Sequence, residues 1–387
     1  MRPDWMKPAV LIASAIASGW VGWSGHMLLL PAAAVFPVLW SHAGNRVTAT
    51  GIAAAYFLAA SRGLPQGVAT FYASDLWPGL LLWIGACLSF VAVHAALWTS
   101  NEKTRPLRYL IAMVLLALPP FGITGWAHPL TAAGVLFAGW GWWGLGAMTA
   151  GLMGLVSRIS PAVAIALSAL WLWSAASVTP RIVIDGWHGV DLNMGASLGR
   201  DTSLSRQRDL IATAKSAAGG EADIVVLPES TLGFWTPTVA RLWRGGLEGM
   251  TLTVIAGAAS ITRDGYENVM VAVSAREARI VYRERMPVPV SMWRPWDRWR
   301  GQPGGAHASF FANPVVEVAG KKIAPIICYE QLVVWPLLQS ILHRPDAVVL
   351  IGNGWWTAGT SIVAIQRMSA QAWAQLFGIP LVMSFNT

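Results

Sequence analysis

The sequence is poor in charge for its length. Only 12% of its 387 residues are Asp, Glu, Lys or Arg, whereas soluble globular domains carry about 25%. Hydrophobic residues make up 55% of the chain, which excludes an intrinsically disordered protein, since such chains are rich in charge and poor in apolar residues. The same numbers argue against a protein that is water-soluble throughout and favour one that contacts a membrane.

Cysteine is scarce as well, and histidine is scattered. The two cysteines, Cys87 and Cys328, lie far apart in the sequence and do not form the disulfide framework of a small secreted domain. No group of Cys and His residues has the spacing of zinc ligands. The sequence therefore predicts neither a metal site nor any other cofactor.

Dense runs of basic residues are also absent, although the formal net charge is +8. Lys and Arg residues beside membrane segments account for such an excess without a nucleic-acid surface. We therefore expect the lipid bilayer as a partner and no nucleic acid.

The charges that are present are concentrated in the second half of the chain. Of the 27 Lys and Arg residues, 8 precede residue 181 and 19 do not. Of the 19 Asp and Glu residues, 3 precede residue 181 and 16 do not. Residues 1–180 are too apolar for an ordinary soluble domain, whereas residues 181–387 can form one. We therefore predict a transmembrane domain over residues 1–180 and a second domain over residues 181–387.

Apolar stretches in the first half predict a polytopic α-helical bundle of about seven spans, because about 20 apolar residues, or as few as 17, can cross a bilayer. With seven spans, the Lys and Arg residues near the span ends, apart from Arg62, fall on one side, which is then cytoplasmic. The second domain is therefore expected outside the cytoplasm. The expected spans are residues 8–24, 27–42, 47–60, 76–98, 107–126, 130–156 and 159–178.

Strand and helix patterns alternate in the second half, which favours a layered α/β sandwich. Three strand patterns run into polar residues, namely Glu229, Cys328 and Asn353. A thiol at a strand-to-helix turn can have its pKa lowered by the helix N-terminus, and a nearby Glu can act as its general base. The alternative is structural, with Cys328 as a small buried residue and Glu229 as a turn residue.

The segments around these residues resemble the carbon–nitrogen hydrolase (nitrilase) superfamily. The resemblance rests on Pro228-Glu-Ser230, on Ile327-Cys-Tyr-Glu330 and on the segment 346–356, which ends in Asn-Gly-Trp-Trp. It implies an α-β-β-α sandwich with a Glu–Lys–Cys triad. Apolar spans followed by such a domain are also similar to apolipoprotein N-acyltransferases and to TraB-type conjugal-transfer proteins.

The resemblance implies roles for individual residues. Glu229 would be the general base and Cys328 the nucleophile, which would form a thioester with an acyl group. The backbone N–H of Tyr329 would stabilise the oxyanion. The further residues that the resemblance places in the oxyanion and substrate region are Glu330, Asn353 and Trp355.

The position of the family's lysine is a departure from the pattern. In the matching stretch, residues 282–292, Glu284 stands where the lysine is expected, between Arg283 and Arg285. A carboxylate there would raise the pKa of the cysteine, whereas a cation would stabilise the thiolate. Either a shift of one residue brings Arg283 or Arg285 into the site, or the chemistry is impaired. The sequence also ends at Thr387, where the family usually continues with more strands.

Two hypotheses follow for the function. The first is a bacterial inner-membrane protein with a periplasmic nitrilase-like domain. This domain would perform Cys-dependent acyl transfer or amide hydrolysis on a phospholipid or protein substrate. The setting would be conjugal plasmid transfer, or envelope or pilus maturation. The second is a nitrilase-fold scaffold of a conjugal transfer apparatus that has lost catalysis. A transporter-like bundle is disfavoured, because no charged residue lies deep in the clear spans.

Overall fold

The computed structural model describes residues 5–177, 182–196, 203–220, 222–302 and 304–387, so the predicted boundary between residues 180 and 181 lies outside the described residues. The chain forms two compact units, which we call the helical unit and the sandwich unit. The helical unit comprises residues 1–181, 332–335 and 359–378, and the sandwich unit comprises residues 182–331, 336–358 and 379–387.

The helical unit consists of short helices. Its α-helices are α1 (Met6–Gly22), α2 (Val35–Ser41), α3 (Arg46–Ala60), α4 (Leu64–Tyr72), α5 (Leu76–Leu97), α6 (Arg105–Ala117), α7 (Ala133–Leu136), α8 (Gly141–Leu155), α9 (Ser160–Ala176) and α14 (Ile362–Phe377). Three 3₁₀ segments join them, namely η1 (Met27–Ala34), η2 (Phe121–Ile123) and η3 (Pro129–Ala132).

The prediction of a polytopic membrane bundle is wrong. Among the described residues one helix, α5 with 22 residues, is long and apolar enough to cross a membrane. The other apolar helices of this unit are shorter, with at most 17 residues, which is the lower limit of the length that can cross a bilayer. The multi-pass topology and the periplasmic placement of the second domain therefore lose their basis.

Two of the expected spans fail because the helices break inside them. Helix α6 ends at Ala117, shortly before Pro119 and Pro120, since proline removes a helical hydrogen bond and restricts the residue before it. The expected span 130–156 is interrupted between α7 and α8, where Gly139 and Gly141 adopt positive φ angles of 79° and 55°. Hydropathy detected the apolar character of these stretches but not their interruptions.

Helix α14 belongs to the helical unit, although the sequence places it within residues 181–387. It packs against α7, and Gly134 of α7 permits the close approach. A Cβ atom at Gly134 would lie 1.9 Å from the carbonyl oxygen of Ala372 in α14, so no larger residue fits without moving a helix. The compact units therefore do not follow a single cut in the sequence.

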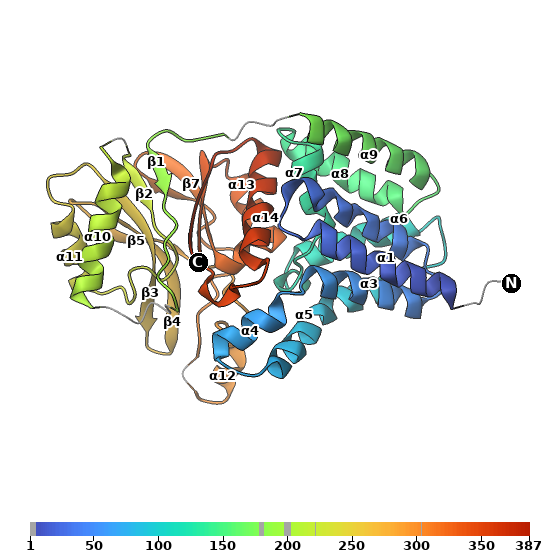
Figure 1. Ribbon diagram of the computed structural model, residues 1–387, viewed down its shortest axis with the longest axis horizontal. Coiled ribbons are helices and arrows are strands. Elements are labelled where there is room, and N and C mark those ends of the chain that lie inside the picture. Colours follow the sequence, from blue (N-terminus) through green and yellow to red (C-terminus); the bar gives the residue numbers. More distant parts are fainter. Residues whose placement is uncertain (1–4, 178–181, 197–202, 221, 303) are drawn as a thin grey trace. The chain divides into compact units, whose positions relative to one another are not determined.

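The sandwich unit contains two β-sheets (Figure 1). The first has the order β1-β2-β3-β4-β5, with β1 (Trp187–Gly189), β2 (Ile224–Val226), β3 (Thr253–Thr262), β4 (Gly265–Val273) and β5 (Ala278–Arg283). The second has the order β6-β7-β8-β9, with β6 (Val316–Val318), β7 (Lys321–Ile327), β8 (Ala347–Asn353) and β9 (Leu381–Asn386). Strands β1, β2 and β3 are parallel to one another, and so are β7, β8 and β9.

Alternation along the strands builds one apolar layer on each face of the first sheet. Ile224 and Val226 of β2 pack with residues of both sheets, whereas Val225 and Leu227 pack with α10 (Leu204–Ala218) and α11 (Pro237–Gly246). This pattern follows from the period of two in a strand. Both helices lie on the outer side of that sheet, as Figure 1 shows.

The two sheets are joined where the segment that follows β1 meets β9. The backbone N–H of Phe385 donates to Oδ1 of Asp191 at 2.9 Å, and the N–H of Leu192 donates to the carbonyl of Phe385 at the same distance. The remaining elements of the unit are α12 (Pro295–Trp299), η4 (Cys328–Gln331), most of α13 (Val334–Leu342) and η5 (Trp355–Thr357). The ends of β7 and β8 lie side by side, because Ile327 pairs with Ile351.

Candidate active site

Cys328 occupies a sharp turn at the end of β7. Strand β7 ends at Ile327, and Cys328 begins the short 3₁₀ helix η4 with a φ angle of 44°. A positive φ in a residue other than glycine costs about 1–3 kcal/mol and persists only where the surroundings hold it. Because the side chain is only 4% exposed, the thiol is held in one place and away from bulk water.

A single amide joins two buried carboxyl groups beside this thiol. Nδ2 of Asn268, in β4, donates to Oε1 of Glu229 and to Oε2 of Glu284, each at 2.8 Å. The backbone N–H of Glu284 donates in turn to the carbonyl of Asn268 at 2.9 Å. All three side chains are less than 5% exposed, so the structure brings Glu229 and Glu284 together through a residue that sequence analysis did not select.

The Glu229 carboxylate is hydrogen-bonded to the Cys328 thiol. Burial raises the pKa of Glu229 to about 7, against the lowering effect of hydrogen bonds from Asn268, from the thiol and from the backbone N–H of Asn353. A carboxyl with a pKa near 7 can accept a proton and return it at neutral pH. Glu229 therefore has the contact and the proton affinity of a general base.

The thiol of Cys328 is in its neutral form at rest. Burial raises its pKa well above the usual range, and the charges of Glu229 and Glu284 raise it further. The expectation that a helix N-terminus lowers this pKa is therefore wrong, because the helix that follows is a 3₁₀ segment of four residues and two carboxyl groups face the sulfur. Removal of the thiol proton requires a base that touches it.

Glu330 does not face the thiol but holds the turn that carries it. Its carboxylate accepts hydrogen bonds from the backbone N–H groups of Ile327, Arg285 and Met286 and from the hydroxyl of Tyr282, at 2.7–3.2 Å. The side chain is 0% exposed. The carboxylate thus connects the strand before the nucleophile to the segment that carries Glu284.

The two arginines that flank Glu284 lie outside the thiol site. Arg285 is 0% exposed and lies 3.8 Å from Glu330, and its other donors reach Gln339 and Ser340. Arg283 is partly exposed and donates to Glu267 at 2.9 Å. Of the three residues considered for the lysine position, only Glu284 is hydrogen-bonded into the Glu229 cluster.

The other predicted residues lie at or just after the ends of β7 and β8. Asn353 ends β8, and its Oδ1 accepts from Nδ2 of Asn386 at 2.8 Å, while its backbone N–H interacts with Cys328. Tyr329 follows the thiol in η4, and burial raises its pKa above the usual value. Trp355 begins η5 and is partly buried.

Asn268 could have been found from the strand pattern alone. It precedes Val269-Met270-Val271, and alternation puts Asn268 on the same face of β4 as Met270, which packs between the sheets. A polar side chain on that face requires a buried hydrogen-bond partner. The pattern therefore signals a buried polar cluster, although it does not identify the partner.

Gly257 of β3 is a further residue that shapes the site. A Cβ atom there would lie 2.5 Å from Cα of Glu229 and 2.8 Å from the backbone nitrogen of Ser230. We expect Gly257→Ala to displace the Glu229 turn, to cost about 1–3 kcal/mol as overpacking does, and to slow alkylation of Cys328 measured by peptide mass. Gly245→Ala is the control, because no atom lies within 4 Å of a Cβ there. Equal alkylation rates in both variants would contradict the expectation.

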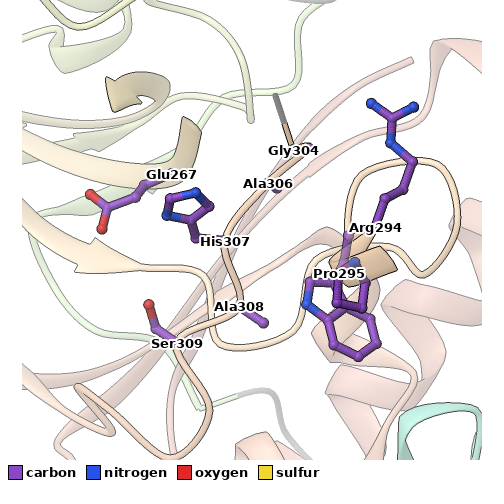
Figure 2. Close-up of a pocket in the computed structure, with 10 residues that line it drawn as sticks. Glu267, Arg294, Pro295, Gly304, Ala306, His307, Ala308 and Ser309 are labelled. Carbon is purple, nitrogen blue, oxygen red and sulfur yellow. The ribbon is translucent and has the colours of Figure 1, made fainter. Parts of the chain in front are cut away.

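A polar cavity of about 320 Å³ lies elsewhere in the sandwich unit. Figure 2 shows Glu267, His307 and Ser309 along one wall and Arg294 with Pro295 along the other. Cys328, Glu229 and Glu284 do not line it. Within the described ranges, no group of three or more His, Cys, Asp or Glu side chains could hold a metal ion.

The chain is similar to conjugal transfer proteins along its whole length. It is 62% identical to the probable conjugal transfer protein TraB of Sinorhizobium fredii, over 100% of both chains. It is 61% identical to the conjugal transfer protein TraB of Agrobacterium fabrum, over 100% of this chain and 94% of that protein.

The chain also matches a protein family over most of its length and has a weaker similarity to solved structures. An amidase of the nitrilase superfamily from Nesterenkonia aligns with 53% of this chain and 79% of its own, with a TM-score of 0.40 and 12% identity. The family described as carbon–nitrogen hydrolase matches residues 58–375. The resemblance inferred from the sequence is thereby confirmed, and the chain belongs to the carbon–nitrogen hydrolase family.

Proposed function

We propose that the protein catalyses acyl transfer or amide hydrolysis through a thioester on Cys328. The observation that carries this proposal is the hydrogen bond between the buried Cys328 thiol and the Glu229 carboxylate. Because both groups are buried and the thiol contacts the carboxylate, the proton can pass between them without rearrangement.

The reaction has two halves. In the first, Glu229 takes the thiol proton while Sγ attacks the carbonyl carbon of an acyl donor, and the leaving group departs with that proton as the thioester forms. In the second, water or an amine gives a proton to Glu229 and attacks the thioester, and the Cys328 sulfur leaves and regains the proton. In this reaction the backbone N–H of Tyr329, the residue that follows Cys328, would stabilise the oxyanion of both halves, and Asn353 and Trp355 would contact the acyl group.

The setting that we propose is conjugal plasmid transfer, since the similar proteins of Sinorhizobium fredii and Agrobacterium fabrum are named for it. Helix α5 would attach the protein to the bacterial inner membrane. Attachment there would bring the site near phospholipids and envelope or pilus proteins, which are the acyl donors and acceptors that we propose.

A scaffold without catalysis is the second candidate. It is favoured by one observation, namely that Glu284, the residue expected at the position of the family's lysine, raises the pKa of Cys328. Such a protein would keep the fold and its partners in the transfer apparatus but would not need the thiol.

Plasmid transfer in bacteria that depend on this chain distinguishes the two candidates. We expect Cys328→Ser to abolish transfer although the protein is present at normal levels, because serine at this site is a far weaker nucleophile than cysteine. Cys87→Ser, the same substitution in α5, is the control and should leave transfer unchanged. Normal transfer by Cys328→Ser would reject catalysis and support the scaffold.

A further inference from the structure

Glu229 and Glu284 share one hydrogen-bond donor. An amide nitrogen carries two hydrogens, and Nδ2 of Asn268 uses one for each carboxyl group. Within the described residues, Oε1 of Glu284 has no hydrogen-bond partner although it is fully buried. One oxygen of Glu284 is therefore held in place, and the other is available.

Among the described residues, neither carboxyl group has a salt bridge to a cation. The guanidinium of Arg285 lies beside Glu330 and that of Arg283 beside Glu267, so both positive charges of this segment are already compensated. Two buried carboxyl groups that lie this close and lack a cation cannot both ionise, because the second charge would be repelled by the first. The pair must therefore retain a proton at neutral pH.

The surroundings of the two groups favour Glu284 as the carrier of this proton. Burial and the charges of Glu330 and Glu229 raise the pKa of Glu284 well above its usual value, whereas the pKa of Glu229 rises only to about 7. Glu229 also contacts the thiol and accepts its proton. The roles of base and acid are thus divided between the two carboxyl groups by their surroundings.

We propose that Glu284 is the acid of the site, which holds a proton on Oε1 and donates it in a hydrogen bond to the carbonyl oxygen of the acyl substrate. This inference rests on the proposed thioester reaction. As Sγ of Cys328 attacks, the electrons of the C=O double bond move to oxygen, and the O–H of Glu284 stabilises the oxyanion. When the tetrahedral adduct collapses, the electrons return to the carbonyl and Glu284 keeps its proton. A neutral acid would thus provide the stabilisation that a lysine ammonium provides by charge.

The inference predicts a rate profile with two limbs. The rate of acylation of Cys328 by p-nitrophenyl acetate should rise through pH about 7, where Glu229 ionises, and fall at higher pH, where Glu284 loses its proton. Glu284→Gln keeps an N–H donor that does not titrate, so it should retain the rising limb and lose the falling limb. Glu284→Leu has no donor, so it should be slower by roughly 10²–10³-fold at the pH optimum of the unmodified protein and should show no falling limb.

Glu317→Gln, the same substitution at an exposed position of β6, should keep both limbs. A falling limb that persists in Glu284→Gln, or a Glu284→Leu variant as fast as the unmodified protein, would overturn the inference.

Infrared spectroscopy tests the proton independently of catalysis. At neutral pH the full-length protein should show a carboxylic-acid C=O band that weakens in Glu284→Gln and is unchanged in Glu317→Gln. A spectrum that Glu284→Gln does not alter would overturn the inference. If the band behaves as expected but no thioester forms on Cys328 in the unmodified protein, the proposed function fails instead and donation to a substrate fails with it.

Discussion

Glu229→Gln is expected to slow thioester formation on Cys328 by roughly 10²–10⁴-fold, which is the usual contribution of a positioned general base. Glutamine has the size of glutamate and can still accept the hydrogen bond from Asn268, but it cannot take the thiol proton. Because burial keeps the Cys328 thiol neutral, a variant without the base has few thiolates to react. We therefore expect a loss of rate without a loss of structure.

The measurement is the rate at which the peptide that contains Cys328 gains the mass of an acetyl group from p-nitrophenyl acetate. The unmodified protein should accelerate through pH about 7, whereas Glu229→Gln should react only at the alkaline pH at which the thiol ionises by itself. Glu248→Gln, an exposed glutamate of the same unit, is the matched control. If Glu229→Gln reacted as fast as that control at pH 7, Glu229 could not be the base.

Part of the site could be predicted from the sequence, because the ends of buried strands can be recognised there. An apolar run followed by a polar residue marks such an end, and Glu229, Cys328 and Asn353 all follow runs of this kind. The cluster around Glu284 was not accessible, since the spacing of residues 283–285 cannot show which side chain turns inward. The answer depends on the pairing of β4 with β5, where a bulge between Met270 and Val271 shifts the register.

The helical unit shows the limit of composition as evidence. Its apolar stretches have the hydropathy of membrane spans, but helix breaks at Pro119 and at Gly139 divide two of them. Residues in these stretches also pack inside the unit, as when Nε1 of Trp23 donates to the hydroxyl of Tyr56 at 2.9 Å with both side chains fully buried. Apolar content therefore cannot distinguish a protein core from a lipid-facing surface.

Arg285→Met is expected to destabilise the sandwich unit by about 3–5 kcal/mol, because it removes one member of a buried ion pair and leaves the Glu330 charge uncompensated. Arg285 and Glu330 are both 0% exposed and lie 3.8 Å apart. Arg283→Met is the matched control in the same segment, since its pair with Glu267 is partly exposed and such pairs contribute about 0–1 kcal/mol.

Hydrogen exchange of the full-length protein locates the loss. The backbone N–H groups of Ile327 and Met286 donate to Glu330, so the peptides that contain them should exchange faster in Arg285→Met and at the normal rate in Arg283→Met. Cys328 should also become more accessible to alkylation, because its strained turn is held by the same carboxylate. Equal protection in the two variants would mean that Glu330 does not need its counter-ion to hold the turn. The nucleophile would then depend on the backbone hydrogen bonds alone, and Arg285 would have no part in maintaining the site.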